Sequence, residues 1–169
     1  MMRSTLTATA YHEAGHAVAA HVLKFPIRSV SIVQDLDTAG RMVYRSPLAG
    51  IRLDFDGSDR ARLRAESAII VALAGPAAQR RYSPRSVRSW HASGDYELAG
   101  ELAMRVNGSA AATNAYLKWL QIRTGDLLAG RWRTVDALAR ALIEQKTIDG
   151  NSAVTAMNGS STGTIRTFG

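Results

Sequence analysis

Two histidines and a glutamate form the most informative pattern in the sequence. His12, Glu13 and His16 stand in the order His-Glu-x-x-His within residues 11–17. On a helix, His16 would lie about 40° around from His12 and Glu13 about 100°, so all three side chains share one sector. Two neutral imidazoles one turn apart can bind the same zinc ion, whereas Glu13 lies too far round to ligate and can take a proton from zinc-bound water. The pattern predicts zinc-dependent hydrolysis.

The pattern is rare enough to carry weight. In a chain with four histidines and five glutamates, chance would produce about 0.003 occurrences of the His-Glu-x-x-His pattern. The rest of the sector is Ala, Gly and Val, so His12, Glu13 and His16 are the polar exceptions on a face expected to be buried. His21 is nine residues beyond His12, about 180° round the helix, and is not expected to join the site.

A catalytic zinc site usually has three protein ligands and leaves the fourth position for water. The downstream segment offers His91, Asp95, Glu97 and Glu101 as the third ligand. Asp95 stands at an expected helix start, where an aspartate can instead stabilise the positive end of the helix dipole. Residue chemistry alone leaves these four candidates open.

The elements that must position these residues are an N-terminal helix and a small sheet. We expect a helix from about Thr5 to Lys24, capped by Ser4 and ended by Pro26. Alternating side chains predict a strand within 28–33, and residues 41–44 form a second extended candidate. The loop over 35–40 between them indicates a hairpin.

Helices dominate the remaining sequence. Ser58 is expected to cap a helix that Gly75-Pro76 breaks or kinks. After a loop over 82–92, a short helix is expected over 94–106, and apolar spacing predicts one long helix over 109–146. The fold class is therefore α+β and mainly helical, with the His-Glu-x-x-His helix beside a small β-sheet and a long C-terminal helix. We expect one domain over 1–150 and a flexible tail over 151–169.

Composition excludes several classes of protein. The 169 residues include no cysteine, which excludes disulfides, thiolate metal sites and cysteine nucleophiles. No stretch of 18 residues is apolar without a charge, and no secretory leader is recognisable, so we expect a cytoplasmic protein without a membrane span. The net charge is +7, but the arginine clusters lack interleaved aromatic residues, which favours a solvated face over a nucleic-acid groove.

Several segments, taken in order, resemble the peptidase domain of the FtsH family of ATP-dependent zinc metalloproteases. The resemblance covers about residues 4–150 and is most specific at the His-Glu-x-x-His segment and at Ser93-Gly94-Asp95-Tyr96-Glu97-Leu98-Ala99. Weaker matches occur at 38–44, at 72–79, which is similar to the family's Ala-Gly-Arg-Ala-Ala-Glu helix, and at 137–150.

The resemblance implies that Asp95 is the third zinc ligand, with His12 and His16, and that Glu13 is the catalytic base. Two departures stand out. Pro76 replaces the family's usual arginine, and no G-x-x-x-x-G-K-[ST] phosphate loop is present. We recognise neither the family's membrane anchor nor its ATPase module, so a separate ATPase is a candidate partner and the family's hexameric assembly does not carry over.

We expect a zinc metalloendopeptidase that hydrolyses peptide bonds in unfolded or flexible protein segments. The strand around 40–44, if it forms an exposed edge, could hold an extended substrate by β-augmentation. An adaptor that keeps the fold without catalysis is the alternative, with the Trp- and Leu-rich long helix as its docking surface. A basic nucleic-acid module is the weaker rival.

Overall fold

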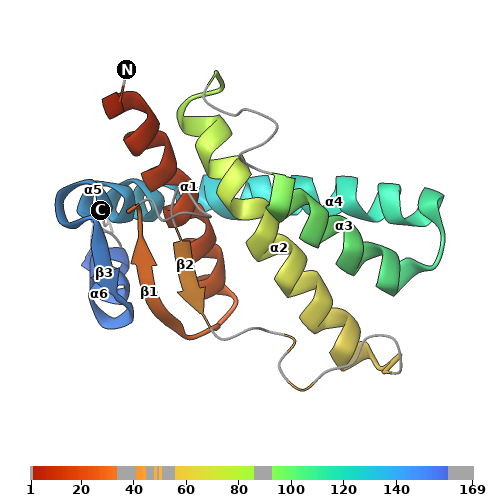
Figure 1. Cartoon of the computed structure of the whole chain (residues 1–169). Helices are drawn as coiled ribbons and strands as arrows, with labels where there is room; N and C mark the ends of the chain where they lie inside the picture. Colours follow the sequence, from red (N-terminus) through yellow and green to blue (C-terminus); the bar gives the residue numbers. More distant parts are fainter. Residues whose placement is uncertain are drawn as a thin grey trace, which may run out of the picture.

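A computed structural model describes most of the chain. The described residues are 2–33, 41–44, 48, 50, 56–85 and 93–159. Their elements, in chain order, are α1 (Met2–Val22), β1 (Ile27–Ser31), β2 (Arg41–Tyr44), α2 (Asp59–Tyr82), α3 (Ser93–Asn107), α4 (Ala110–Gly130), α5 (Trp132–Gln145), β3 (Thr147–Asp149) and α6 (Gly150–Gly159). The mainly helical α+β class is confirmed, and Figure 1 shows its small sheet beside α1.

The sheet has three antiparallel strands in the order β2-β1-β3. β1 is the central strand, and its Val30 is paired with Met42 on one side and with Ile148 on the other. Val30 is fully buried and Arg28 is exposed, as expected for a strand with one face on the core. β2 is therefore an edge strand of this sheet.

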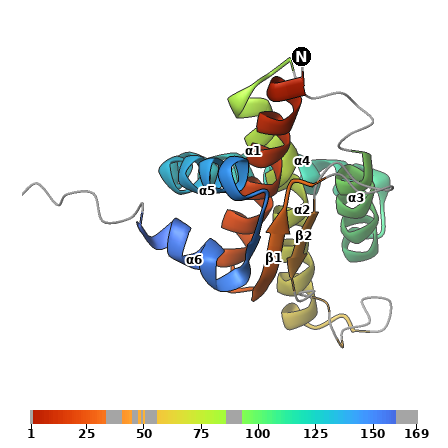
Figure 2. The same cartoon turned by 60° about the vertical axis from the view of Figure 1, so that its left-hand side comes forward.

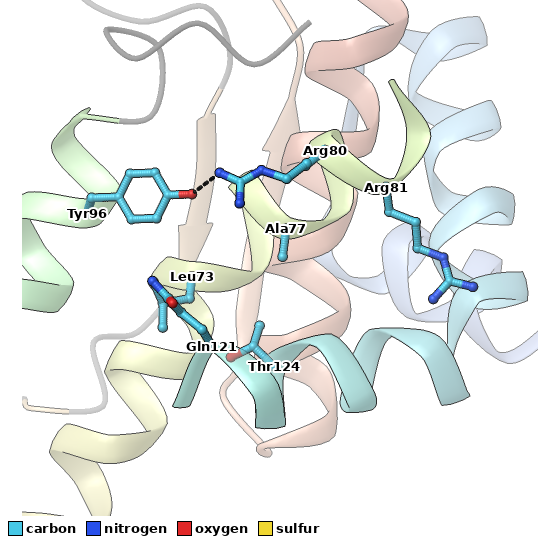
Figure 3. Close-up of a pocket in the computed structure, with 7 residues that line it drawn as sticks. All are labelled: Leu73, Ala77, Arg80, Arg81, Tyr96, Gln121 and Thr124. Carbon is cyan, nitrogen blue, oxygen red and sulfur yellow. Dashed lines mark hydrogen bonds between the residues drawn. The ribbon is translucent and has the colours of Figure 1, made fainter. Parts of the chain in front are cut away.

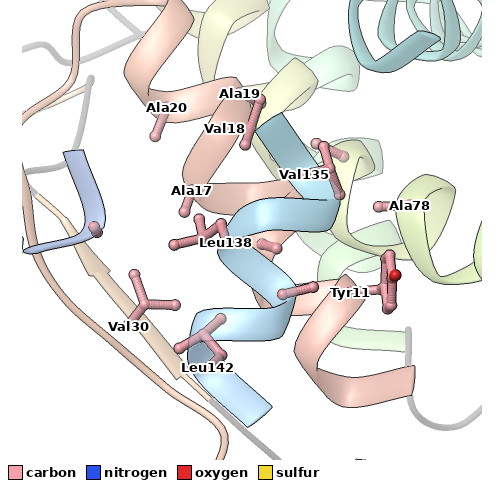
Figure 4. Packing of buried hydrophobic residues seen from close by; sticks show 14 of the residues in the cluster. Tyr11, Ala17, Val18, Ala19, Ala20, Val30, Ala78, Val135, Leu138 and Leu142 are labelled. Atoms are coloured by element: carbon pink, nitrogen blue, oxygen red, sulfur yellow. The ribbon is translucent and has the colours of Figure 1, made fainter. Parts of the chain in front are cut away.

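Two apolar clusters hold the helices together, and α2 contributes to both. In the first cluster, Val18 of α1 packs with Leu138 and Leu142 of α5 and with Val30 of the sheet (Figure 4). The second cluster joins α2, α3 and α4. Figures 1 and 2 show the sheet on one side of α2 and the α3–α4 pair on the other. Because α2 lies between the two clusters, it can connect residues of α1 with residues of α3.

Most expected elements are confirmed, with differences at their ends. Ser58 caps α2 by accepting a hydrogen bond from the backbone N–H of Ala61, as expected. α1 begins at Met2, so the expectation that Ser4 caps it is wrong. Of the break or kink expected at Gly75-Pro76, the break is wrong, because α2 continues through Pro76 to Tyr82. This stretch of α2 is buried, and packing outweighs the missing proline N–H.

The expected single helix over 109–146 is two helices. α4 ends at Gly130, and the backbone N–H of Arg131 bonds to the carbonyl of Leu128 before α5 begins. Buried Leu128 and Val135 are seven residues apart, two helical turns, so the apolar spacing continues across the interruption. Hydrophobic periodicity therefore could not reveal it.

The segment after residue 150 also differs from the expectation. Residues 150–159 form α6, which buries Ala153 and Met157 in the first cluster. Residues 160–169 of the expected tail lie outside the described residues, as do the expected loop over 35–40 and residues 86–92 of the expected loop over 82–92. No helix in the described part of the chain is both long and apolar enough to cross a membrane.

Candidate metal centre

α1 and α3 bring three potential metal ligands to one point. The Nε2 atoms of His12 and His16 are 3.0 Å apart. Oδ2 of Asp95, from the first turn of α3, lies 3.0 Å from Nε2 of His12 and 3.4 Å from Nε2 of His16. These three residues form the one His, Asp or Glu group with metal-ligand spacing among the residues that the structure describes.

Hydrogen bonds on the far side of each imidazole fix which nitrogen is free to bind a metal. Nδ1 of His12 lies 2.9 Å from Oε1 of Gln79, and Nδ1 of His16 lies 2.7 Å from the carbonyl oxygen of Val71. Both partners are oxygens that accept, so each Nδ1 carries the proton and donates it. When the imidazole is neutral, its Nε2 therefore keeps a lone pair directed at the shared point, the arrangement usual for metal-binding histidines.

The spacing of the three atoms fits zinc. Zinc bonds measure about 2.0 to 2.1 Å to nitrogen and about 2.0 to 2.2 Å to carboxylate oxygen, so neighbouring ligands of a tetrahedral site are about 3.3 to 3.5 Å apart. The observed separations of 3.0 to 3.4 Å are equal to that spacing or slightly shorter. A nitrogen–nitrogen–oxygen set without sulfur also suits a catalytic zinc site that keeps one position open.

Electrostatics couple the three side chains. Burial lowers the pKa of His16, but the hydrogen bond and charge of Asp95 outweigh it and raise the pKa to about 9. Burial acts to raise the pKa of Asp95, but the two histidines outweigh it and hold that pKa well below its usual range. Binding of a metal ion would displace the proton that these three side chains share in its absence, because an imidazole must be neutral to act as a ligand.

Glu13 lies beside the three ligands without belonging to their group. Its side chain is buried, and burial raises its pKa, opposed by the charges of His16 and His12. The backbone N–H of Met42 in β2 donates a hydrogen bond to its carboxylate. Glu13 is thus a buried base candidate placed between the metal ligands and the edge strand of the sheet.

The close approach of α2 to α1 depends on glycine. A Cβ added at Gly75 would lie 2.2 Å from Nε2 of His16, and one added at Gly15 would lie 2.5 Å from the carbonyl oxygen of Ala74. Both distances are shorter than real Cβ contacts allow. Any side chain at Gly75 would therefore displace a ligand atom of the site.

We expect Gly75→Ala to weaken zinc binding by at least about tenfold, the lower end of what changes around a metal ligand cost. The added methyl group forces the His16 ring out of position. Zinc affinity measured by competition with a chelating dye would show the loss.

Gly100→Ala is the control, since a Cβ there meets nothing within 4 Å. It should leave zinc affinity unchanged and stabilise α3 by up to about 1 kcal/mol. Equal affinity in Gly75→Ala and wild type would contradict this packing.

Hydrogen bonds and stacked rings brace the helices around the site. Arg80, which follows Gln79, donates from Nη2 to the hydroxyl of Tyr96, which follows Asp95, at 2.9 Å. Figure 3 shows this bond across a pocket of about 290 Å³ between α2, α3 and α4. Tyr11 of α1, which precedes His12, stacks on Tyr82 of α2 with ring centroids 3.8 Å apart. Each contact ties a residue adjacent to the site to a neighbouring element.

The other sequence candidates stand apart. Glu97 and Glu101 are exposed and outside the ligand group, and Glu101 pairs with Arg105 at 2.6 Å. His21 lies at the far end of α1 and lines a different pocket, near Arg131 and Asn158. His91 lies outside the described residues.

Sequence reasoning missed the residues that support the site. Gln79 and the carbonyl of Val71 hold the two imidazoles, and Gly75 makes room for one of them. The one available signal was the similarity of residues 72–79 to a family helix, which placed this segment near the chemistry but gave Gln79 no role.

No family model matches the chain, and no curated protein sequence matches it either. The interpretation of the site therefore depends on its geometry and residue chemistry. The FtsH resemblance of the sequence stays a prediction.

Proposed function

We propose that this protein is a zinc metallopeptidase, similar to the peptidase domain of the FtsH family, that cleaves unfolded or flexible protein segments. The observation that carries the proposal is the convergence of His12, His16 and Asp95 beside a buried Glu13. A purely structural zinc site would use four protein ligands, and among the residues that the structure describes this group has three.

In this proposal His12, His16 and Asp95 hold zinc. When bound there, zinc would acidify water and polarise a peptide carbonyl. Glu13 takes the proton of the attacking water and passes it to the leaving amine. The burial that raises the pKa of Glu13 favours this role, because a carboxylate with a raised pKa is a stronger base. Gln79 and Val71 hold the imidazoles in the required tautomer throughout.

The position of β2 supports an extended peptide as substrate. β2 is an edge strand, and the hydrogen bond from Met42 to Glu13 places its backbone beside the base. A substrate segment could add to this edge by β-augmentation, which gives affinity through backbone hydrogen bonds and needs an unfolded chain.

The substrate's folding state provides the test. We expect the zinc-loaded 169-residue chain to cleave an unfolded protein such as casein, and to cleave a stably folded domain slowly, in proportion to the population of its open forms. ATP should change neither rate, because the chain has no phosphate-binding loop. Gel-based cleavage assays of both substrates, each with and without ATP, measure this.

Equal cleavage of folded and unfolded substrates, or stimulation by ATP without a partner, would contradict the proposed substrate class. Absence of cleavage in protein that holds one zinc per chain would contradict the activity itself. That outcome would favour the adaptor, or a requirement for a separate ATPase.

A further inference from the structure

The outer face of α4 is exposed and largely apolar. It consists of Ala115, Lys118, Trp119, Ile122, Gly125, Asp126 and Ala129, all of which are exposed. The side chain of Ile122 is 57% exposed and that of Trp119 is 45% exposed. The opposite face of α4 packs Leu120, Thr124 and Leu128 inside the protein. A helix that is apolar on both faces is normally covered on both.

The outer face has a self-complementary order about Ile122. Lys118 and Asp126 lie four residues before and after Ile122, about 6 Å along the axis in each direction. They carry opposite charges. Ala115 and Ala129 lie seven residues before and after Ile122. Trp119, a large side chain, lies three residues before Ile122, and Gly125, which has no side chain, lies three residues after it. An antiparallel copy of α4 centred on Ile122 would meet each residue with its complement.

We propose that two copies of this chain associate through the outer faces of α4, antiparallel, around a twofold axis near Ile122. Lys118 of each copy then lies opposite Asp126 of the other, which gives two equivalent ion pairs. A face that matches itself under a twofold rotation is what an isologous dimer requires. The proposal concerns assembly and is independent of the proposed activity.

The charged residues of the face are free for this pairing. Neither Lys118 nor Asp126 makes an ion pair with another residue in the described ranges. Opposite charges placed across an interface set its register and exclude misaligned pairings. Their symmetric placement about Ile122 therefore favours a second copy over an unrelated partner.

Neighbouring side chains fix the orientation of Trp119 in the apolar part of this face. The Trp119 ring stacks against Tyr116, with centroids 5.7 Å apart, and the Arg123 guanidinium lies 4.9 Å from the Trp119 centroid on the ring face. Arg123 is in turn paired with Glu66. An aromatic side chain already fixed loses little conformational entropy on binding. A Cβ added at Gly125 would meet nothing within 4 Å, so this part of the helix is open to close approach.

Charge reversal tests the pairing directly. Sedimentation velocity over a range of concentrations should show a monomer–dimer equilibrium for the wild type. Asp126→Lys and Lys118→Asp, each alone, place like charges opposite each other twice per dimer and should weaken association by at least about tenfold. The double variant Lys118→Asp/Asp126→Lys restores opposite charges and should return the dissociation constant to near the wild-type value. Glu144→Lys, at an exposed position on α5, makes the same change of charge as Asp126→Lys and is its matched control, which should have no effect.

Ile122→Lys places two like charges at the twofold axis and should abolish the dimer. Circular dichroism should be unchanged in every variant, because all the altered side chains are exposed. A wild-type chain that stays monomeric at the highest concentration would overturn the proposal. So would a dimer that Ile122→Lys leaves intact, or single reversals that the double variant fails to rescue.

Discussion

Glu13→Gln is expected to abolish peptide hydrolysis while zinc stays bound. Glutamine has nearly the shape of glutamate but cannot accept the proton of the attacking water. A general base contributes typically about 10²- to 10⁴-fold to a rate, so kcat should fall by at least about 10². Hydrolysis of a quenched fluorescent casein, with zinc content measured on the same sample, gives both quantities.

The control for this substitution is Glu97→Gln. It makes the same chemical change on an exposed residue of α3 two positions from Asp95. Its activity and zinc content should equal those of the wild type. Full activity in Glu13→Gln protein that contains one zinc per chain would eliminate Glu13 as the base.

Asp95→Ala is expected to remove zinc from the protein. The change takes away one of three ligands and the negative charge that favours a cation beside the two imidazoles. Changes that only reorient a ligand cost about 10- to 100-fold in metal affinity, so losing the ligand itself should cost more than about 100-fold. Elemental analysis after dialysis against a weak chelator measures the retained zinc.

His91→Ala and Glu101→Ala test the alternative third ligands. Both proteins should keep one zinc per chain, because Asp95 completes the ligand set. If Asp95→Ala retained its zinc and His91→Ala lost it, the third ligand would be His91 and not Asp95.

The local features of the fold could be predicted from the sequence. The 41–44 strand, the Ser58 cap and the helix after residue 93 all follow from short-range patterns of alternation, capping and charge. The shared direction of His12 and His16 likewise follows from the helical repeat, because four residues make about one turn. Each of these features depends on neighbours in the chain.

Features set by distant residues could not be predicted in this way. Gln79 contacts His12 across 67 positions, and the need for glycine at position 75 arises only when α2 packs on α1. The continuity of α2 through Pro76 depends on the burial of this part of the helix, which local sequence patterns do not predict. Asp95 is intermediate, because residue chemistry left four candidates and only the family resemblance selected among them before the geometry was known.

The most direct test of the central claim is a zinc titration of casein cleavage. Protein stripped of metal should be inactive, and the cleavage rate should rise in proportion to added zinc and level off at one zinc per chain. This result follows if His12, His16 and Asp95 form a single catalytic zinc site. Cleavage that persists in metal-free protein, or a chain that binds one zinc and cleaves nothing, would contradict the account.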